Sequence, residues 1–344
     1  MLKNPMSRGN CMNTLRLFGA LDVMLGHIVK HLEIKIPLVD MFITLVDGVP
    51  LFFIISGYLT WISVSQTDDV VLYAKKRFFR VYPELWVGNI LSCIAILLFY
   101  QEEIVWSRFG LFFLCQSTVL QFWTPQFLRG YGCGTPNGSL WTMCVIVQFY
   151  IAVWLFRKLF RGKTWLFWIT AFVSFVVTGS ALVNLEKVLP EILYKLYCQT
   201  LIPYAWLFLL GMLLADKQEY ILVGLKKYWH VSLTFCFLVR FLPWKMVISG
   251  YSVLDNIALG LFCIGFAYAF PGLNIKRDIS YALYIYHMIV VNVMITVGCK
   301  GTMSAIIIAC AVSTMLAFLS TRYISNPIQR KAARMKDSAG GSGL

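Results

Sequence analysis

The sequence predicts an all-α membrane protein that crosses the bilayer many times. Of its 344 residues, 59% are hydrophobic and 13% are charged, whereas a soluble domain carries about 25% charged residues. Apolar runs close to the length of a membrane-spanning helix recur from the first twenty residues almost to the end. The net charge of +14 comes from short basic clusters between these runs. This distribution is typical of a membrane protein and argues against a nucleic-acid-binding patch.

The apolar runs predict about ten membrane spans. Candidate segments lie near 15–32, 41–64, 82–100, 109–122, 141–156, 164–183, 197–215, 229–243, 253–270, 281–298 and 303–320. The segment 109–122 is only about 14 residues long, so we expect it to be re-entrant or interfacial. Without it, the N- and C-termini are both cytoplasmic and residues 101–140 face outward.

Basic clusters support this topology. The two main clusters are Lys75, Lys76, Arg77 and Arg80, and Arg157, Lys158, Arg161 and Lys163. Both should be cytoplasmic, so an even number of spans must separate them. We expect residues 1–336 to form a single transmembrane domain and the Gly- and Ser-rich residues 337–344 to be an appended tail outside it.

The ten cysteines do not suggest a disulfide framework or a metal centre. None form a C-x-x-C motif, and most lie inside apolar runs, where a free thiol is usually a small buried hydrophobe. Cys133, in a polar segment flanked by Cys115 and Cys144, is the only candidate for a disulfide.

Polar residues in the first predicted span point to a chemical site. Arg16 and His27 are eleven residues apart and share a helix face, with His27 roughly 16 Å deeper in the bilayer. An interfacial cation below a titratable imidazole suits a proton-handling site that receives an anionic molecule. The alternative is a snorkelling arginine and a hydrogen-bonded core histidine. His31 lies one turn after His27, but two histidines make a poor metal site, and we expect no metal.

Three later segments carry further polar or helix-bending residues. The stretch 48–59 places Pro50 and the pair Ser56-Gly57 within one span, where they are expected to kink the helix. Arg77 and Arg80 lie one turn apart at the predicted start of the third span, and paired arginines match phosphate oxygens. The alternative reading of these arginines is ordinary cytoplasmic flanking.

The third such segment is Ser280 to His287 in the tenth predicted span. Tyr284 and His287 are three residues apart and therefore share a helix face. An interfacial aromatic belt accounts for the tyrosines but not for a histidine at membrane depth.

Taken in order, these segments resemble the membrane-bound acyltransferase-3 family, bacterial O-acyltransferases that acetylate cell-surface glycans. The matching motifs are Arg16 with His27, the stretch 48–59, Arg77 with Arg80 and Pro83, Ser139 to Thr142 with Gln148 to Tyr150, and Ser280 to His287. They run in the family's order over nearly the whole chain. The chain is similar to the single-module members that acetylate O-antigen and other surface polysaccharides.

The resemblance implies transfer of an acetyl or other acyl group from cytoplasmic acyl-CoA to a hydroxyl of a lipid-linked polysaccharide such as O-antigen, in the bacterial inner membrane. The implied catalytic residues are His27, Arg16, Asp22 and Asp47. The implied donor site for acetyl-CoA contains Arg16, Ser56, Lys76, Arg77, Arg80, Tyr284 and His287. Because residues 101–140 face outward, we expect a glycan site of Ser139, Trp141 and Gln148, below a Gly-rich segment from Gly130 to Gly138 that can adapt to the acceptor. The alternative is that Trp141 is an interfacial anchor and the segment a plain connector.

This chain departs from the family at three acidic positions. Ile146 and Val147 occupy the place of an acidic residue, Pro50 replaces an aspartate and Asn326 replaces a glutamate. The carboxylate that would partner the histidine therefore stays open, with Asp22 and Asp47 as the candidates.

Two other classes of protein are weighed against the enzyme. A transporter of a phosphorylated or lipid-linked metabolite would use the same arginines, but the sequence lacks the paired broken helices of transporter repeats. A non-catalytic scaffold does not need ionisable groups in its spans. The expected partners are the bilayer, acyl-CoA and a glycan, with no nucleic acid, and a homo-oligomer stays open.

Overall fold

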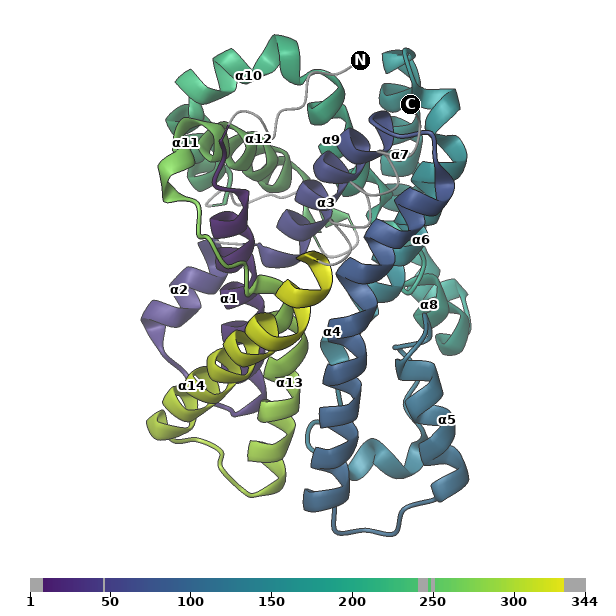
Figure 1. Cartoon of the computed structure of the whole chain (residues 1–344), viewed down its shortest axis with the longest axis vertical. Helices are drawn as coiled ribbons and strands as arrows, with labels where there is room; N and C mark the ends of the chain where they lie inside the picture. The colour runs from purple at the N-terminus through teal and green to yellow at the C-terminus, as the bar shows by residue number, and fades with distance from the viewer. Residues whose placement is uncertain (1–8, 46, 241–246, 249–250, 331–344) are drawn as a thin grey trace. The chain divides into compact units, whose positions relative to one another are not determined.

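The computed structural model describes residues 9–45, 47–240, 247–248 and 251–330, and these residues are predominantly helical (Figure 1). The α-helices are α1 (Met12–His31), α2 (Pro37–Leu45), α3 (Gly48–Ser65), α4 (Val70–Phe99), α5 (Trp106–Gln116), α6 (Trp141–Phe160), α7 (Thr164–Val188), α8 (Glu191–Tyr197), α9 (Ala205–Asp216), α10 (Gln218–Lys227), α11 (Trp229–Arg240), α12 (Val253–Ala269), α13 (Ser280–Thr296) and α14 (Met303–Ser320). The all-α class is confirmed.

Short elements join the helices. The 3-10 turns are η2 (Gln126–Gly130), η3 (Gly138–Leu140), η4 (Ile202–Tyr204) and η5 (Pro271–Leu273), and α14 continues into the π-helix η6 (Thr321–Ser325). The strands β1 (Val247–Ile248) and β2 (Tyr251–Ser252) pair antiparallel, with Val247 opposite Ser252. The predicted tail 337–344 lies outside the described residues.

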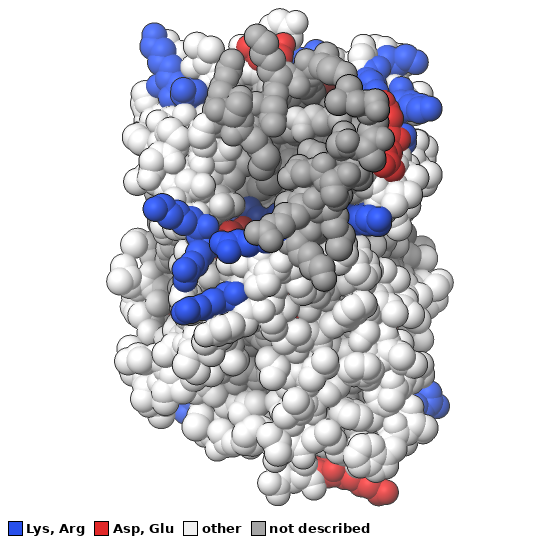
Figure 2. Space-filling model, viewed as in Figure 1, with Lys and Arg blue, Asp and Glu red and all other residues white. Residues whose placement is uncertain are grey.

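Four helical segments of the described chain are long and apolar enough to cross a membrane on their own. They are Pro37–Ser65, Val70–Phe99, Gly138–Phe160 and Met303–Arg330, and the bent pair Glu191–Tyr197 with Ile202–Asp216 would make a fifth. Thr164–Val176, Val253–Ala269 and Ser280–Thr296 are shorter apolar helices. Most of the described surface in Figure 2 is uncharged, as a bilayer requires. The chain is a membrane protein, and the count of ten spans is not confirmed.

The helices belong to two compact units, each described here by itself. Apart from the gaps given above, the first unit contains residues 9–19, 47–68 and 145–276, and the second contains residues 20–45, 69–144 and 277–330. The helices α1 and α6 each contribute residues to both units.

In the first unit, α3 and α9 approach each other closely through glycines. A Cβ atom at Gly57 would lie 2.1 Å from the carbonyl oxygen of Phe208, and one at Gly211 would lie 2.0 Å from that of Ile54. Small residues at such crossings let two membrane helices touch along their backbones. Pro50 lies in the first turn of α3, where a proline breaks no helical hydrogen bond, and Gly57 serves the helix crossing.

In the second unit, α13 packs against both α14 and α4 (Figure 1). A Cβ atom at Gly88 of α4 would lie 2.3 Å from the Ile285 side chain, so the backbone of α4 comes close to α13. Most of α13 is buried, including the polar residues Ser280, His287 and Asn292. These polar side chains must therefore find partners inside the protein.

The helix α4 begins well before the predicted span 82–100. Asp69 caps it, accepting hydrogen bonds from the backbone N–H groups of Val71 and Leu72 at 2.8 and 3.1 Å. Hydropathy hides this start because the first turns are basic, although Lys and Arg are good helix formers. Arg77 and Arg80 therefore lie inside the helix and not at its beginning.

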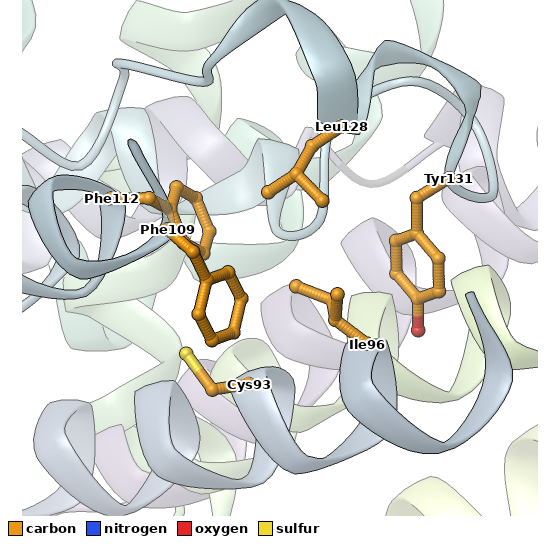
Figure 3. Packing of buried hydrophobic residues seen from close by; sticks show 6 residues of the cluster. All are labelled: Cys93, Ile96, Phe109, Phe112, Leu128 and Tyr131. Atoms are coloured by element: carbon orange, nitrogen blue, oxygen red, sulfur yellow. The ribbon is translucent and has the colours of Figure 1, made fainter. Parts of the chain in front are cut away.

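An apolar cluster holds α5 and the segment after it against α4 (Figure 3). Cys93 and Ile96 of α4 meet Phe109 and Phe112 of α5, with Leu128 and Tyr131 completing the cluster. With eleven residues, α5 is shorter than the predicted segment 109–122 and too short to span a bilayer.

The ten cysteines are all free thiols, so the disulfide candidate at Cys133 is not formed. Burial raises the pKa of the Cys133 thiol, which makes it a poor nucleophile and a slow partner for disulfide exchange.

The Gly-rich segment from Gly130 to Gly138 is not the adaptable loop that its composition suggests. The Asn292 amide of α13 donates to the carbonyl oxygens of Thr135 and Pro136 at 3.1 and 2.9 Å and accepts from the Cys133 N–H at 2.8 Å. Asn137 donates in turn to the carbonyl oxygen of Ile285 at 2.9 Å. These bonds fix the segment on α13.

Gly132 is the position where this docking tolerates no side chain. Its φ is +55°, and a Cβ atom would lie 2.0 Å from Asn292 Oδ1. We expect Gly132→Ala to destabilise the protein by about 2–3 kcal/mol, since it combines a left-handed backbone with displacement of a hydrogen-bonded amide. Thermal unfolding in detergent tests this, with Gly110→Ala as control because nothing lies within 4 Å of that Cβ. Equal unfolding temperatures for the two variants would contradict the docking.

Candidate active site

The centre of the candidate site is a pair of imidazoles from α1 and α13. His27 Nδ1 lies 2.8 Å from His287 Nε2, and the rings are stacked with centroids 5.1 Å apart and planes inclined by 11°. His287 is fully buried, whereas His27 is partly exposed. Sequence reasoning singled out both histidines but did not bring them together, because helix spacing cannot tell which spans are neighbours.

The hydrogen bonds of His287 fix where the protons of a neutral pair reside. His287 Nδ1 lies 3.0 Å from the carbonyl oxygen of Leu283, which can only accept, so Nδ1 carries the proton. His287 Nε2 then accepts, and His27 Nδ1–H must be the donor to it. This arrangement leaves the lone pair of His27 on Nε2, the form required of a general base.

The connection between α13 and α14 ties the C-terminal end of α1 to the same structure. The Gly301 N–H donates to the carbonyl oxygen of Leu32 at 2.9 Å, and Lys300 pairs with Glu33 at 2.8 Å. The hydrogen bond from Lys300 lowers the pKa of the exposed Glu33 carboxyl. These contacts help to hold α1 where His27 reaches His287.

His31 extends the pair toward the end of α1. Its ring centroid lies 5.7 Å from that of His27, with the planes tilted by 38°. No group of three or more His, Cys, Asp or Glu side chains suited to a metal ion occurs in the described part of the chain.

The hydrogen bond of His27 in the structure is to an imidazole, and the roles predicted for Asp22 and Asp47 stay predictions. Asp22 is buried on α1 but lies five residues before His27, which places the two side chains about 140° apart around the helix. Asp47 belongs to the first unit, where it accepts a hydrogen bond from Asn256 at 3.4 Å. The pairing with His287 could not be read from the spacing of acidic residues.

Tyr284 and Ser139 lie beside the pair as structural neighbours. The Tyr284 hydroxyl donates to the Ser139 carbonyl oxygen at 2.8 Å and lies 2.8 Å from the Thr142 hydroxyl. Its ring meets that of His287 edge to face, with centroids 6.0 Å apart. Ser139 is buried, and Trp141 follows it as the half-buried first residue of α6. The start of α6 is thus anchored next to His287.

The predicted donor-binding cations of the second unit lie along α4. The Arg77 guanidinium stacks over the Tyr73 ring at 5.2 Å, Arg80 is half-buried and Lys76 is exposed. Arg77 and Arg80 share a face of α4 with Glu84, one turn further along. Glu84 is buried with 1% of its surface exposed. Sequence reasoning missed it, although a glutamate inside the predicted span 82–100 was an available signal.

Besides Asp47, three predicted residues belong to the first unit. Arg16 is half-buried on α1, and Ser56 is half-buried beside Gly57 on α3. Gln148 of α6 donates to the Gln199 carbonyl oxygen at 2.7 Å and accepts from the Leu201 N–H at 3.0 Å. Its amide is engaged with the backbone that precedes α9.

The described structure is a predominantly helical membrane fold whose second unit contains a hydrogen-bonded pair of imidazoles. The chain matches the acyltransferase domain family over residues 10–322, and it belongs to that family. The resemblance seen in the sequence motifs is confirmed, and the chain is an acyltransferase.

Two known relatives cover nearly the whole chain. Nodulation protein 10 of Rhizobium leguminosarum bv. viciae is 25% identical over 346 residues, covering 93% of this chain and 93% of the relative. The O-acetyl transferase of Shigella phage Sf6 is 24% identical over 342 residues, covering 93% of this chain and 96% of the relative. No solved structure matches the chain.

Proposed function

We propose that the protein transfers an acetyl group from cytoplasmic acetyl-CoA to a hydroxyl of a lipid-linked surface polysaccharide such as O-antigen. The observation that carries this proposal is the His27–His287 pair, whose neutral form presents one free imidazole nitrogen. The phage relative is an O-acetyl transferase, which supports the same chemistry. A sugar hydroxyl is a weak nucleophile, and a positioned base is what it needs.

In the proposed reaction, His27 Nε2 removes the proton from the sugar hydroxyl while its oxygen attacks the thioester carbonyl carbon. The C–S bond then breaks, the acetyl group stays on the sugar oxygen, and the imidazolium returns the proton to the departing thiolate. His287 Nε2 accepts from His27 Nδ1–H throughout. It therefore orients the ring and stabilises the transient positive charge on His27.

The proposed donor site uses the basic residues of α4. Arg77 and Arg80 present planar guanidinium groups on one helix face, a geometry that suits the phosphates of acyl-CoA. Lys76 adds positive charge on the same helix. Arg16 and Ser56 of the first unit stay predicted donor-site residues, as the resemblance implies. Tyr284 and His287 serve this site by shaping the surroundings of His27.

The proposed setting is the bacterial inner membrane, with ten spans and both termini cytoplasmic. The clustering of basic residues in alternate connections supports this topology. The glycan would approach from the outer side over Trp141, where an aromatic face can pack on a sugar ring, with Ser139 and Gln148 holding the surrounding backbone.

Cysteine labelling tests the proposed topology. Gln126 and Lys158 are both exposed, but the proposal places them on opposite sides of the membrane. Gln126→Cys should react with an impermeant thiol reagent added outside intact cells, whereas Lys158→Cys should react only after the cells are opened. Each variant is made in a background without native cysteines. Labelling of Gln126→Cys only in opened cells would overturn the ten-span arrangement.

A histidine substitution tests the proposed reaction. Expression of the wild-type gene should add the mass of acetyl groups to the surface polysaccharide of a host that lacks them. His27→Ala should insert normally but lose transfer by a factor of about 10²–10⁴, because the base is gone. His230→Ala, an exposed histidine on α11, is the matched control. Full transfer by His27→Ala would remove His27 from the mechanism, and no acetyl gain with the wild type would contradict the function.

A further inference from the structure

A buried carboxylate outside the histidine pair accepts hydrogen bonds from hydroxyl groups at the end of α14. Glu84 of α4 accepts hydrogen bonds from the Ser320 and Ser325 hydroxyls, one on each carboxylate oxygen. The Ser320 oxygen also lies 2.7 Å from the Tyr286 hydroxyl of α13. All four residues belong to the second unit. An ionisable group buried at membrane depth is a candidate for function.

Counting the available protons shows which group donates and which accepts in each hydrogen bond of this cluster. The Glu84 oxygens accept hydrogen bonds, so the hydroxyl groups of Ser320 and Ser325 each donate their one proton to Glu84. The Ser320 oxygen is then free to accept, and the Tyr286 hydroxyl is the donor to it. With both Glu84 oxygens accepting, each hydroxyl donates once and the hydrogen bonds form one continuous chain from α13 to α4.

The π-helix η6 is the device that makes this cluster possible. Ser320 and Ser325 are five residues apart, which in an α-helix would turn them about 140° away from each other. The Asn326 N–H bonds to the carbonyl oxygen of Thr321, five residues back, as in a π turn. This wider turn brings residues five apart toward one side, so both serines reach Glu84.

The hydrogen-bonded cluster connects the face of α4 that carries Arg77 and Arg80 to Tyr286, the neighbour of His287. Glu84 lies one turn after Arg80 on the same face of α4, and Tyr286 immediately precedes His287 on α13. The hydrogen bond from Tyr286 therefore fixes the rotation and height of α13 at the point where His287 meets His27.

We propose that Glu84 is a positioning residue for the acyl transfer, accepting hydrogen bonds on both carboxylate oxygens and so holding α13 through Ser320 and Tyr286. This inference rests on the proposed function in so far as the reaction depends on the His27–His287 distance. The acceptor property of the carboxylate is essential to it. An amide at position 84 has one accepting oxygen where the carboxylate has two, so its N–H₂ group must face one of the two serines and break the shared pattern of hydrogen bonds.

A double-mutant cycle tests the connection. Purified Glu84→Gln should lose kcat about tenfold with little change in the KM for the acyl donor, since the base is misplaced and the cations are not. Tyr286→Phe should also lower kcat, and the double variant should be no worse than Glu84→Gln, because both changes break one chain. Ser313→Ala on α14 is the control, since that buried hydroxyl has no hydrogen-bond partner. Additive losses would overturn the proposal.

A second readout separates this inference from the proposed function. In ¹⁵N-histidine spectra, the ring signals that vanish in His287→Asn should shift in Glu84→Gln and in Tyr286→Phe, but not in Ser313→Ala. This measurement needs no acyl transfer, so it holds even if His27→Ala retains activity. Unshifted His287 signals in both variants would overturn the positioning role. If Glu84→Gln fails to insert, Tyr286→Phe alone decides between the two results.

Discussion

The geometry of the candidate site depends on one hydrogen bond between two imidazoles, from His27 to His287. This bond requires α13 to sit at a defined height and rotation, and α1 to meet it. The protein meets this requirement by anchoring α13 along its length. Tyr284 binds the segment before α6 near one end and Asn292 binds it near the other, while Gly88 allows α4 to approach between them.

The polar groups in the second unit explain why such anchoring is effective in a membrane. Apolar packing alone gives little specificity among helices whose surroundings are as apolar as their side chains. The amide of Asn292 and the carboxylate of Glu84 are buried, so losing their partners would be costly. Each bond from these groups therefore selects one arrangement of α13 against many similar ones. His287 therefore has one position, and its hydrogen bond holds the His27 ring in the one orientation that proton transfer requires.

The sequence predicted the parts of this structure that depend on local pattern. The helical class, the membrane setting and the importance of His27 and His287 all follow from apolar runs interrupted by ionisable residues. The pairing of the two histidines could not be predicted, since they lie 260 positions apart and pairing depends on which helices are neighbours. The docked segment near Gly132 was misjudged for a similar reason. Its glycines suggested a conformationally flexible segment, whereas in the structure Gly132 makes room for the Asn292 side chain.

Glu84 illustrates a different limit. It lies inside the predicted span 82–100, but nothing in the sequence shows which side chains of other helices would surround it. The π turn that directs two serines to it has no recognisable signal in Thr321 to Ser325. Such sites emerge only when side-chain partners from separate helices are seen together.

The protonation of the histidine pair is the most direct test of the central claim. Solid-state ¹⁵N spectra of the histidine-labelled wild-type protein in lipid, assigned with His31→Gln and His230→Asn, report which ring nitrogens carry protons. We predict that His27 and His287 are both neutral with the proton on Nδ1, which leaves His27 Nε2 unprotonated. A proton on His27 Nε2, in a neutral or a charged ring, would contradict its role as the base.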